Sequence, residues 1–324
     1  MARLSLGIQM NAWFETYMFI LIPLSLVLGV LCSPLLIEHV SLVPWLFGLV
    51  TFVMGLGCGW KDIVAAFRRP LLFLIVFVMT HLVAPLMAYG FGAVLFGSDS
   101  SYTIGLVLFA VIPLGISSVL WVEMARGAVP IMLALVVVDS LLSPIVVPLS
   151  LSLLYDQSIP FDGWTMLLDL LLIIVMPTLA GIVVHEWTRG QAKPRMAPVL
   201  LPLSKLAFVG VVLLNAAAIG PFVRTWDTEA FIVFAAVCGL VAAFYALGHV
   251  TERLWSPASS PPQYTLGFAS GMRNISLGLV LALQHFGAET AVAVVLAILI
   301  QQPGATIYHW LIRRRQRVIA GNLN

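Results

Sequence analysis

Long apolar runs separated by short polar or basic connections fill nearly all of this 324-residue sequence. A helix needs about 20 apolar residues to cross the roughly 30 Å hydrocarbon core of a bilayer. Runs of about that length cover residues 14–33, 43–60, 70–96, 102–125, 128–154, 164–187, 199–222, 229–250, 263–286 and 289–312. The pattern predicts an all-α polytopic membrane protein with ten transmembrane helices in a single membrane domain, 1–324.

The composition supports the same class. Hydrophobic residues make up 61% of the sequence and charged residues 9%, whereas soluble domains carry about 25% charged residues. A water-soluble fold is therefore excluded. The cysteines, Cys32, Cys58 and Cys238, lie in separate apolar stretches without metal-ligand spacing, so neither a metal site nor another cofactor is expected. The N-terminal stretch has one basic residue, Arg3, and no cleavage site of small residues, so the first apolar run is expected to be retained.

Basic residues are distributed asymmetrically over the connections. Of the 16 Lys and Arg residues, all but Arg224 and Arg273 fall in segments that ten crossings place on one side of the membrane. Such residues concentrate in cytoplasmic loops, so both termini are predicted to be cytoplasmic, in the inner membrane of a bacterium. The basic run 313–317 is interpreted as an anchor at anionic lipid headgroups, and no nucleic-acid partner is expected.

A weak internal repeat is visible in the helix pattern. Residues 13–34 resemble residues 164–187, and each stretch opens a half of five predicted helices, 12–156 and 162–313. Because five is odd, the two halves must cross the bilayer in opposite senses. Inverted repeats of this kind are typical of transporters, so a transporter is favoured over a receptor.

The fourth and ninth predicted helices are irregular. The fourth contains VIPLGISSVLW and the ninth contains LGFASGMRNIS, both too polar and glycine-rich for a lipid-facing surface. Interrupted helices in matching positions of two halves indicate a binding site. The alternative, that both are ordinary helix contacts made by small residues, does not account for Arg273. The candidate substrate-binding residues are Ser117, Ser118, Ser270, Arg273, Asn274 and His81.

Three ionisable residues lie near the middle of their predicted helices: Arg273, Asp139 and His81. Each is about ten residues from the cytoplasmic end, or about 16 Å deep at roughly 1.5 Å per residue. An isolated charge there costs at least about 2.5–3.5 kcal/mol, so it needs a partner. We therefore expect Arg273 to pair with Asp139, either as a bridge that locks the structure or as part of the transport site. His81 and Asp139 are candidates to carry a coupling proton.

Four stretches of the sequence resemble the bile acid:sodium symporter superfamily. They are VPWLFGLVTFVMGLGCGWKDI, THLVAP, VIPLGISSVLWVEMARG continuing to SLLSP, and ASGMRNISLGLVLA. The resemblance implies that helices four and nine are broken and cross at the membrane centre. It also implies a core subdomain of helices 3–5 and 8–10 (70–154 and 229–312) that moves against a panel of helices 1, 2, 6 and 7 (14–60 and 164–222), with an organic anion bound between them.

The sequence departs from that family at the sodium ligands. At the first sodium site Ser118 is kept, but the other positions hold Val119, Met132, Val136 and Ala269. The positions of the second site hold His81, Ala269 and Arg273. Sodium, like other hard cations, needs several oxygen ligands. Neither site is expected to hold it, and the coupling ion, H⁺ or Na⁺, is left open.

These observations predict a secondary active transporter of a small organic anion, proton-coupled or uncoupled, with Arg273 in place of bound sodium. The alternatives are a sodium-coupled symporter, an arsenite-type efflux permease and a non-transporting membrane sensor. An arsenite permease would need a cysteine in the broken fourth helix, and none is present. No nucleophile and base constellation is found, so an enzyme is not expected. The sequence identifies neither the substrate, nor the direction of transport, nor the oligomeric state.

Overall fold

The structure is a computed structural model, and it describes residues 6–67, 70–155, 161–223, 228–255 and 264–321. These residues are almost entirely helical, and their only β-type pairing is an isolated antiparallel bridge between Leu114 and Arg273. Arg224, which the charge pattern placed alone on the opposite side, lies outside the described residues.

The helices follow one another with short connections. In the first half they are α1 (Leu6–Leu31), α2 (Ser33–Leu36), η1 (Ile37–Leu42), α3 (Val43–Gly55), α4 (Trp60–Phe67), α5 (Pro70–Val78), η2 (Met79–Val83), α6 (Ala84–Phe96), α7 (Ser101–Val111), α8 (Ser117–Met124) and α9 (Val129–Tyr155). In the second half they are α10 (Gly163–Leu170), η3 (Leu171–Val175), α11 (Met176–Trp187), α12 (Ala192–Val223), α13 (Thr228–Trp255), α14 (Thr265–Gly271), α15 (Ile275–His285) and α16 (Ala288–Gly321).

Within the described residues, seven helical stretches are long and apolar enough to cross a membrane, and the bent helix α1 makes an eighth. A multi-pass membrane protein is thus confirmed. In the pairs α7/α8 and α14/α15, each single helix is too short to meet that criterion. They lie where the sequence predicts broken helices four and nine. The arrangement of ten helices as two inverted repeats stays a prediction.

Two predicted helix starts are wrong by several residues. Helix α1 begins at Leu6 rather than at residue 14, and α12 begins at Ala192 rather than at residue 199. Helix α12 continues through Pro198 and Pro202, although a proline inside a helix removes one hydrogen bond.

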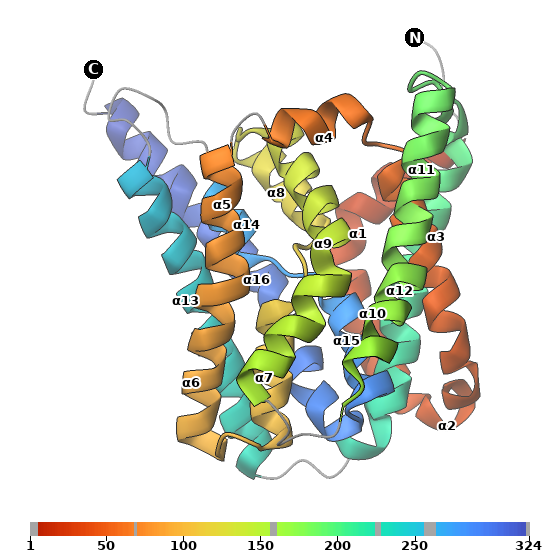
Figure 1. Cartoon of the computed structure of the whole chain (residues 1–324). Helices are drawn as coiled ribbons and strands as arrows, with labels where there is room; N and C mark the ends of the chain where they lie inside the picture. The colour runs from red at the N-terminus through yellow and green to blue at the C-terminus, as the bar shows by residue number, and fades with distance from the viewer. Residues whose placement is uncertain (1–5, 68–69, 156–160, 224–227, 256–263, 322–324) are drawn as a thin grey trace.

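Figure 1 shows α3, α11 and α12 along one side of the molecule and α5, α6 and α13 along the other. Helix α12 packs against α1 and α3, and α3 also packs against α11. On the other side α13 packs against α14 and α16, and α7 packs against α6 and α16. Helix α1 begins and α16 ends at the same end of the bundle, so the chain traverses it an even number of times (Figure 1).

The two broken helices lie at the centre of this arrangement. Every residue of α7 from Thr103 to Val111 is buried, as is every residue of α14. Residues 275–282 of α15 are buried as well. Their unwound segments are therefore enclosed by protein, as backbone without helical hydrogen bonds must be at membrane depth.

Candidate functional site

The first break separates α7 from α8 at residues 112–116, and the second separates α14 from α15 at residues 272–274. Pro113 has no N–H to continue α7, and the preceding residue, Ile112, turns to an extended conformation with ψ of 151°. In the second break Met272 is extended as well, with φ and ψ of −120° and 122°. The chain is thus unwound for a few residues in each helix.

The two unwound segments pair with each other. The N–H of Gly115 donates to the carbonyl of Met272 at 3.2 Å, and the N–H of Asn274 donates to the carbonyl of Pro113 at 2.7 Å. These bonds satisfy backbone groups that the breaks release from the helices. The crossing implied by the family resemblance is therefore present in the structure.

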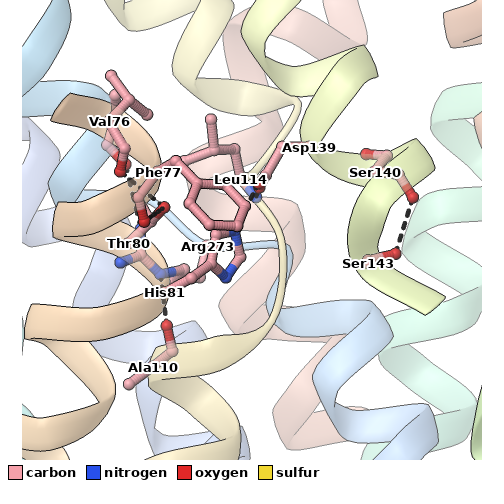
Figure 2. Close-up of polar contacts among 11 residues, drawn as sticks. Val76, Phe77, Thr80, His81, Ala110, Leu114, Asp139, Ser140, Ser143 and Arg273 are labelled. Atoms are coloured by element: carbon pink, nitrogen blue, oxygen red, sulfur yellow. Dashed lines mark hydrogen bonds and ion pairs between the residues drawn. The ribbon is translucent and has the colours of Figure 1, made fainter. Parts of the chain in front are cut away.

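Asp139 on α9 lies directly beside this crossing (Figure 2). One carboxylate oxygen accepts a hydrogen bond from the N–H of Leu114 at 2.7 Å, and the other lies 2.5 Å from Nε2 of His81. Asp139 is 5% exposed and His81 is 8% exposed. The carboxylate is thus removed from water but paired on both oxygens, as a buried charge requires.

His81 is carried by the π-helical turn η2. Pro85 follows four residues later and has no N–H for the His81 carbonyl, and the N–H of Ala84 reaches back five residues to Met79. The bulge presents His81 toward α9, with its ring 4.9 Å from that of Phe77. π-Bulges are frequent at functional sites.

Arg273 lies in the second break and is 1% exposed. Its Nε donates to the carbonyl of Ala110 at 2.9 Å, and its Nη1 donates to the carbonyl of Ala269 at 3.1 Å. The guanidinium also lies 5.5 Å from the centre of the Phe244 ring. Ala110 and Ala269 are near the C-terminal ends of α7 and α14, where the helix dipole is negative. A single cation therefore serves both helix ends.

The expected direct pair of Arg273 with Asp139 is corrected by this geometry. No hydrogen bond or ion pair joins the two side chains among the described residues. Both oxygens of Asp139 are occupied by His81 and Leu114, and Arg273 binds main-chain carbonyls instead. The two charges still attract each other electrostatically. The breaks release backbone groups that compete for both side chains.

Two adjacent glutamines on α16 hold the two breaks, and the sequence analysis missed their role. Gln301 accepts from the N–H of Arg273 at 2.7 Å and donates to its carbonyl at 3.1 Å. Gln302 accepts from Nε1 of Trp121 at 3.1 Å and donates to Oγ of Ser117 at 3.3 Å. Two side-chain amides within the apolar part of α16 were the available signal.

A buried carboxylate at the start of α14 was also missed. Glu252 on α13 accepts from the N–H of Thr265 at 3.0 Å and from that of Gly267 at 3.4 Å. Tyr264, which precedes α14, makes no side-chain cap. Glu252 thus caps this half-helix from a neighbouring helix, where a negative charge is favourable.

The remaining predicted substrate residues lie around the crossing with different environments. Ser118 is buried and its Oγ donates to the carbonyl of Gly115 at 2.5 Å. Ser270 is buried, and its hydroxyl has no hydrogen-bond partner among the described residues. Asn274 is buried in front of α15 without capping it through its side chain, and Ser117 is half-buried at the start of α8.

At the positions where the family resemblance implies sodium ligands, only Ser118 carries a side-chain oxygen. Met132, Val136 and Ala269 are fully buried, and Val119 is half-buried. Within the described residues, no group of three or more His, Cys, Asp or Glu side chains is placed to hold a metal ion. The cation at this crossing is the guanidinium of Arg273.

The breaks also bring helix ends of opposite polarity together. Helices α8 and α15 begin at the crossing, so the positive ends of their dipoles lie there, whereas α7 and α14 end there. The C-terminal ends are occupied by Arg273. The N-terminal ends of α8 and α15 are suited to an anion.

Comparisons with known proteins agree with this architecture. A family model described as "Sodium Bile acid symporter family" matches residues 43–223. The chain is 34% identical over 300 residues to the uncharacterized protein YbaS of Bacillus subtilis strain 168, covering 91% of this chain and 96% of that protein. It is 25% identical to the uncharacterized sodium-dependent transporter YocS of the same bacterium, over 78% and 77% of the two chains. It is also 25% identical to the probable chloroplastic sodium/metabolite cotransporter BASS2 of Oryza sativa subsp. japonica, over 82% and 63%.

Proposed function

The chain belongs to the sodium bile acid symporter family, and from this premise we propose that it carries a small organic anion with Arg273 in place of bound sodium. It is a multi-pass membrane transporter and not an enzyme.

The observation that carries the proposal is the position of the guanidinium. Arg273 binds the carbonyl oxygens of Ala110 and Ala269, which are hard ligands of the kind that sodium prefers. Because the guanidinium is a cation fixed to the chain at this position, a bound sodium ion is unnecessary there. Met132 and Val136 stand at positions where the family resemblance implies sodium ligands, and their apolar side chains agree with this interpretation.

The substrate class follows from the polarity of the helix ends at the crossing. With the negative ends of α7 and α14 neutralised by Arg273, the positive ends of α8 and α15 are left for an anionic group. Ser117 and Asn274 stand at these ends and could donate hydrogen bonds to a carboxylate. A small organic carboxylate fits this arrangement.

The proposed mechanism is alternating access. Residues 70–154 and 229–312 form the moving core, and residues 14–60 and 164–222 form the panel. The two inverted halves supply the outward-facing and inward-facing states. Both termini are placed on the cytoplasmic side of the inner membrane, as the basic residues indicate. Helices of the same proposed subdomain pack together, such as α1 with α12 and α13 with α16.

The pair formed by His81 and Asp139 is the candidate proton carrier. It is buried, it lies beside the crossing, and its separation of 2.5 Å allows a proton to be shared. Because Asp139 also binds Leu114, a change in the protonation of the pair would act directly on the broken segment of the α7/α8 helix.

Two measurements test the proposal in sequence. Thermal unfolding of the purified protein across a panel of organic anions, with sodium or potassium as the cation, identifies a ligand, because ligands of the native state stabilise it by mass action. Uptake of that labelled anion into proteoliposomes then tests coupling. We expect equal uptake in sodium and potassium, and faster uptake with an inward proton gradient. A strict requirement for sodium would overturn the role of Arg273.

Sodium-coupled transport is the second candidate, because relatives such as YocS and BASS2 are named for sodium dependence. Arsenite efflux is disfavoured because Cys32, Cys58 and Cys238 all lie outside α7 and α8. A sensor that does not transport would bind the anion without any flux, and the same pair of assays separates it from a transporter.

A further inference from the structure

A groove of about 900 Å³ lies between α13 and α16. Val241 and Ala242 of α13 and Pro303 and Ile307 of α16 form part of its wall, which is overwhelmingly apolar. Ile307 is 60% exposed, so this wall is open to the surroundings of the protein. Helix α13 stands at the outer edge of the bundle in Figure 1, where a membrane protein meets lipid.

Small side chains create the space between the two helices. Ala242, Ala246 and Gly304 all line the groove. A Cβ atom on Gly304 would lie 3.0 Å from a methyl group of Val241 and 3.2 Å from the ring of Tyr245, so the two helices approach closely beneath it. The groove is thus an elongated depression with a closed floor, of a shape that accepts a chain.

One end of the groove is polar and positively charged. Arg253 and His249 of α13 line it there, and Nδ1 of His249 lies 3.2 Å from the hydroxyl of Tyr308. Arg253 is exposed and makes no hydrogen bond or ion pair with the other described residues. The neighbouring Glu252 forms no ion pair with Arg253, because its carboxylate is buried and accepts hydrogen bonds from the backbone of α14.

The continuation of α16 adds to the charge at the same end. Arg314 stacks on Trp310 with its guanidinium 5.5 Å from the ring centre, and Arg313 precedes it. Aromatic and basic side chains of this kind gather at the level of lipid headgroups. Arg253 and Phe234, at the two ends of the α13 wall, are about 28 Å apart at roughly 1.5 Å per residue. One leaflet of hydrocarbon is about 15 Å thick, so the wall is long enough for an acyl chain.

We propose that this groove binds one anionic phospholipid of the cytoplasmic leaflet. Its phosphate lies against Arg253 and His249, and one acyl chain runs along Ala242 toward Phe234. A small soluble anion could pair with Arg253 but would leave the apolar wall uncovered. Basic pockets between transmembrane helices on the cytoplasmic side are suited to anionic headgroups.

Binding can be measured on the purified full-length protein in mild detergent, without any transport substrate. Native mass spectrometry counts the bound lipids, and thermal unfolding reports stabilisation, with phosphatidylglycerol compared with phosphatidylcholine. We expect one retained phosphatidylglycerol and a rise in Tm that phosphatidylcholine does not produce. Because no substrate is present, the result is independent of the proposed transport function.

Two variants test the headgroup and chain contacts separately. Arg253→Gln removes the charge, and Ala242→Phe fills the wall at an exposed position without touching the charge. Each is expected to abolish the effect of phosphatidylglycerol on Tm. The control, Arg195→Gln, changes an exposed basic residue of α12 outside the groove and should keep the effect.

Three results would overturn the proposal. Equal stabilisation by both lipids would mean that no anionic headgroup is recognised. Unchanged phosphatidylglycerol binding in both variants would place the lipid elsewhere. A dimer in the mass spectrum that dissociates in Ala242→Phe would mean that a second copy of the chain covers the groove.

Discussion

Asp139 and Arg273 take the two halves of one helical hydrogen bond. In an unbroken helix the N–H of Leu114 would donate to the carbonyl of Ala110, four residues earlier. Here the N–H of Leu114 donates to Asp139 at 2.7 Å, and the carbonyl of Ala110 accepts from Arg273 at 2.9 Å. The anion satisfies the donor and the cation satisfies the acceptor. The break is therefore stabilised by both charges without direct contact between them.

The first prediction concerns which of these residues are energetically coupled. Removing one partner of a buried ion pair costs about 3–5 kcal/mol. His81→Gln and Asp139→Asn should each lower the free energy of unfolding, and the double variant should lose less than the sum by about 0.5–3 kcal/mol. The control cycle combines Arg273→Gln with Asp139→Asn, where the contact is indirect, and should give a smaller coupling. Unfolding in mixed micelles measures both cycles, and a larger coupling in the control would contradict the assigned partners.

The second prediction concerns the amide of Gln301, which bonds both the N–H and the carbonyl of Arg273. Gln301→Leu leaves both groups buried without a partner, at about 1–3 kcal/mol for each. Gln302→Leu is the matched control, because its bonds to Ser117 and Trp121 are only partly buried. Thermal unfolding should show a clearly larger loss for Gln301→Leu. Equal losses would mean that Gln301 does not hold the break.

The third prediction concerns the closeness of the two unwound segments. A Cβ atom on Gly115 would lie 2.7 Å from the carbonyl oxygen of Arg273, which is backbone and has little freedom to move. Gly115→Ala should therefore push the segments apart and reduce both Tm and transport. Gly90→Ala on α6 is the control, since a Cβ there meets no atom within 4 Å. That change should be neutral or stabilise by about 0.5–1 kcal/mol, because alanine favours helix. A wild-type Tm and transport rate in Gly115→Ala would show that the crossing is looser than described.

The positions of the breaks could be predicted from the sequence, but the partners of the charges could not. Pro113 and Gly115 mark the first break by their own chemistry, since one has no N–H and the other has no side chain. The location of Asp139 and His81 inside long apolar helical stretches likewise follows from the length of the apolar runs. Periodicity and charge pattern are local properties, and these features are local.

The partners of Arg273 are main-chain carbonyls, which every residue has, so no residue type marks them in advance. A pairing rule that considers only side chains selects Asp139, the acidic residue expected at a similar depth. The roles of Gln301 and Glu252 are hidden for a similar reason, because each binds backbone groups that become free only where a distant helix is broken or begins.

The fourth prediction concerns Cys58, in the connection between α3 and α4. Burial raises the pKa of its thiol from 9.0 to about 12, and the nearby charge of Asp62 adds to the shift. At pH 8 the thiolate is thus on the order of a thousandfold scarcer than for an ordinary cysteine, and the thiolate is the reactive form. A variant that keeps Cys58 alone should react slowly with N-ethylmaleimide, whereas one that keeps the half-buried Cys32 alone should react faster. Equal rates in the folded state would contradict the burial.

The same shift has a consequence for stability at high pH. Because the folded state binds the thiol proton more tightly than the unfolded state, this contribution is complete below pH 9 and is lost as the pH rises toward 12. Cys58→Ser should therefore show a smaller loss of Tm between these pH values than the unaltered chain. A loss of the same size would mean that other groups account for it.

The fifth prediction is a change of coupling ion. The family resemblance implies that sodium ligands stand at the positions where this chain has Ala269 and Arg273. Ala269→Glu combined with Arg273→Gln removes the fixed cation, supplies carboxylate and amide oxygens, and frees the carbonyls of Ala110 and Ala269 for an ion. Uptake by this double variant should depend on sodium, whereas uptake by the unaltered chain should not.

Arg273→Gln alone is the control. It leaves the carbonyls unpaired without supplying a carboxylate, so it should lose uptake in either salt. If the double variant is folded and remains indifferent to sodium, the guanidinium does not occupy the place of an ion, and its role is to hold the two broken helices together.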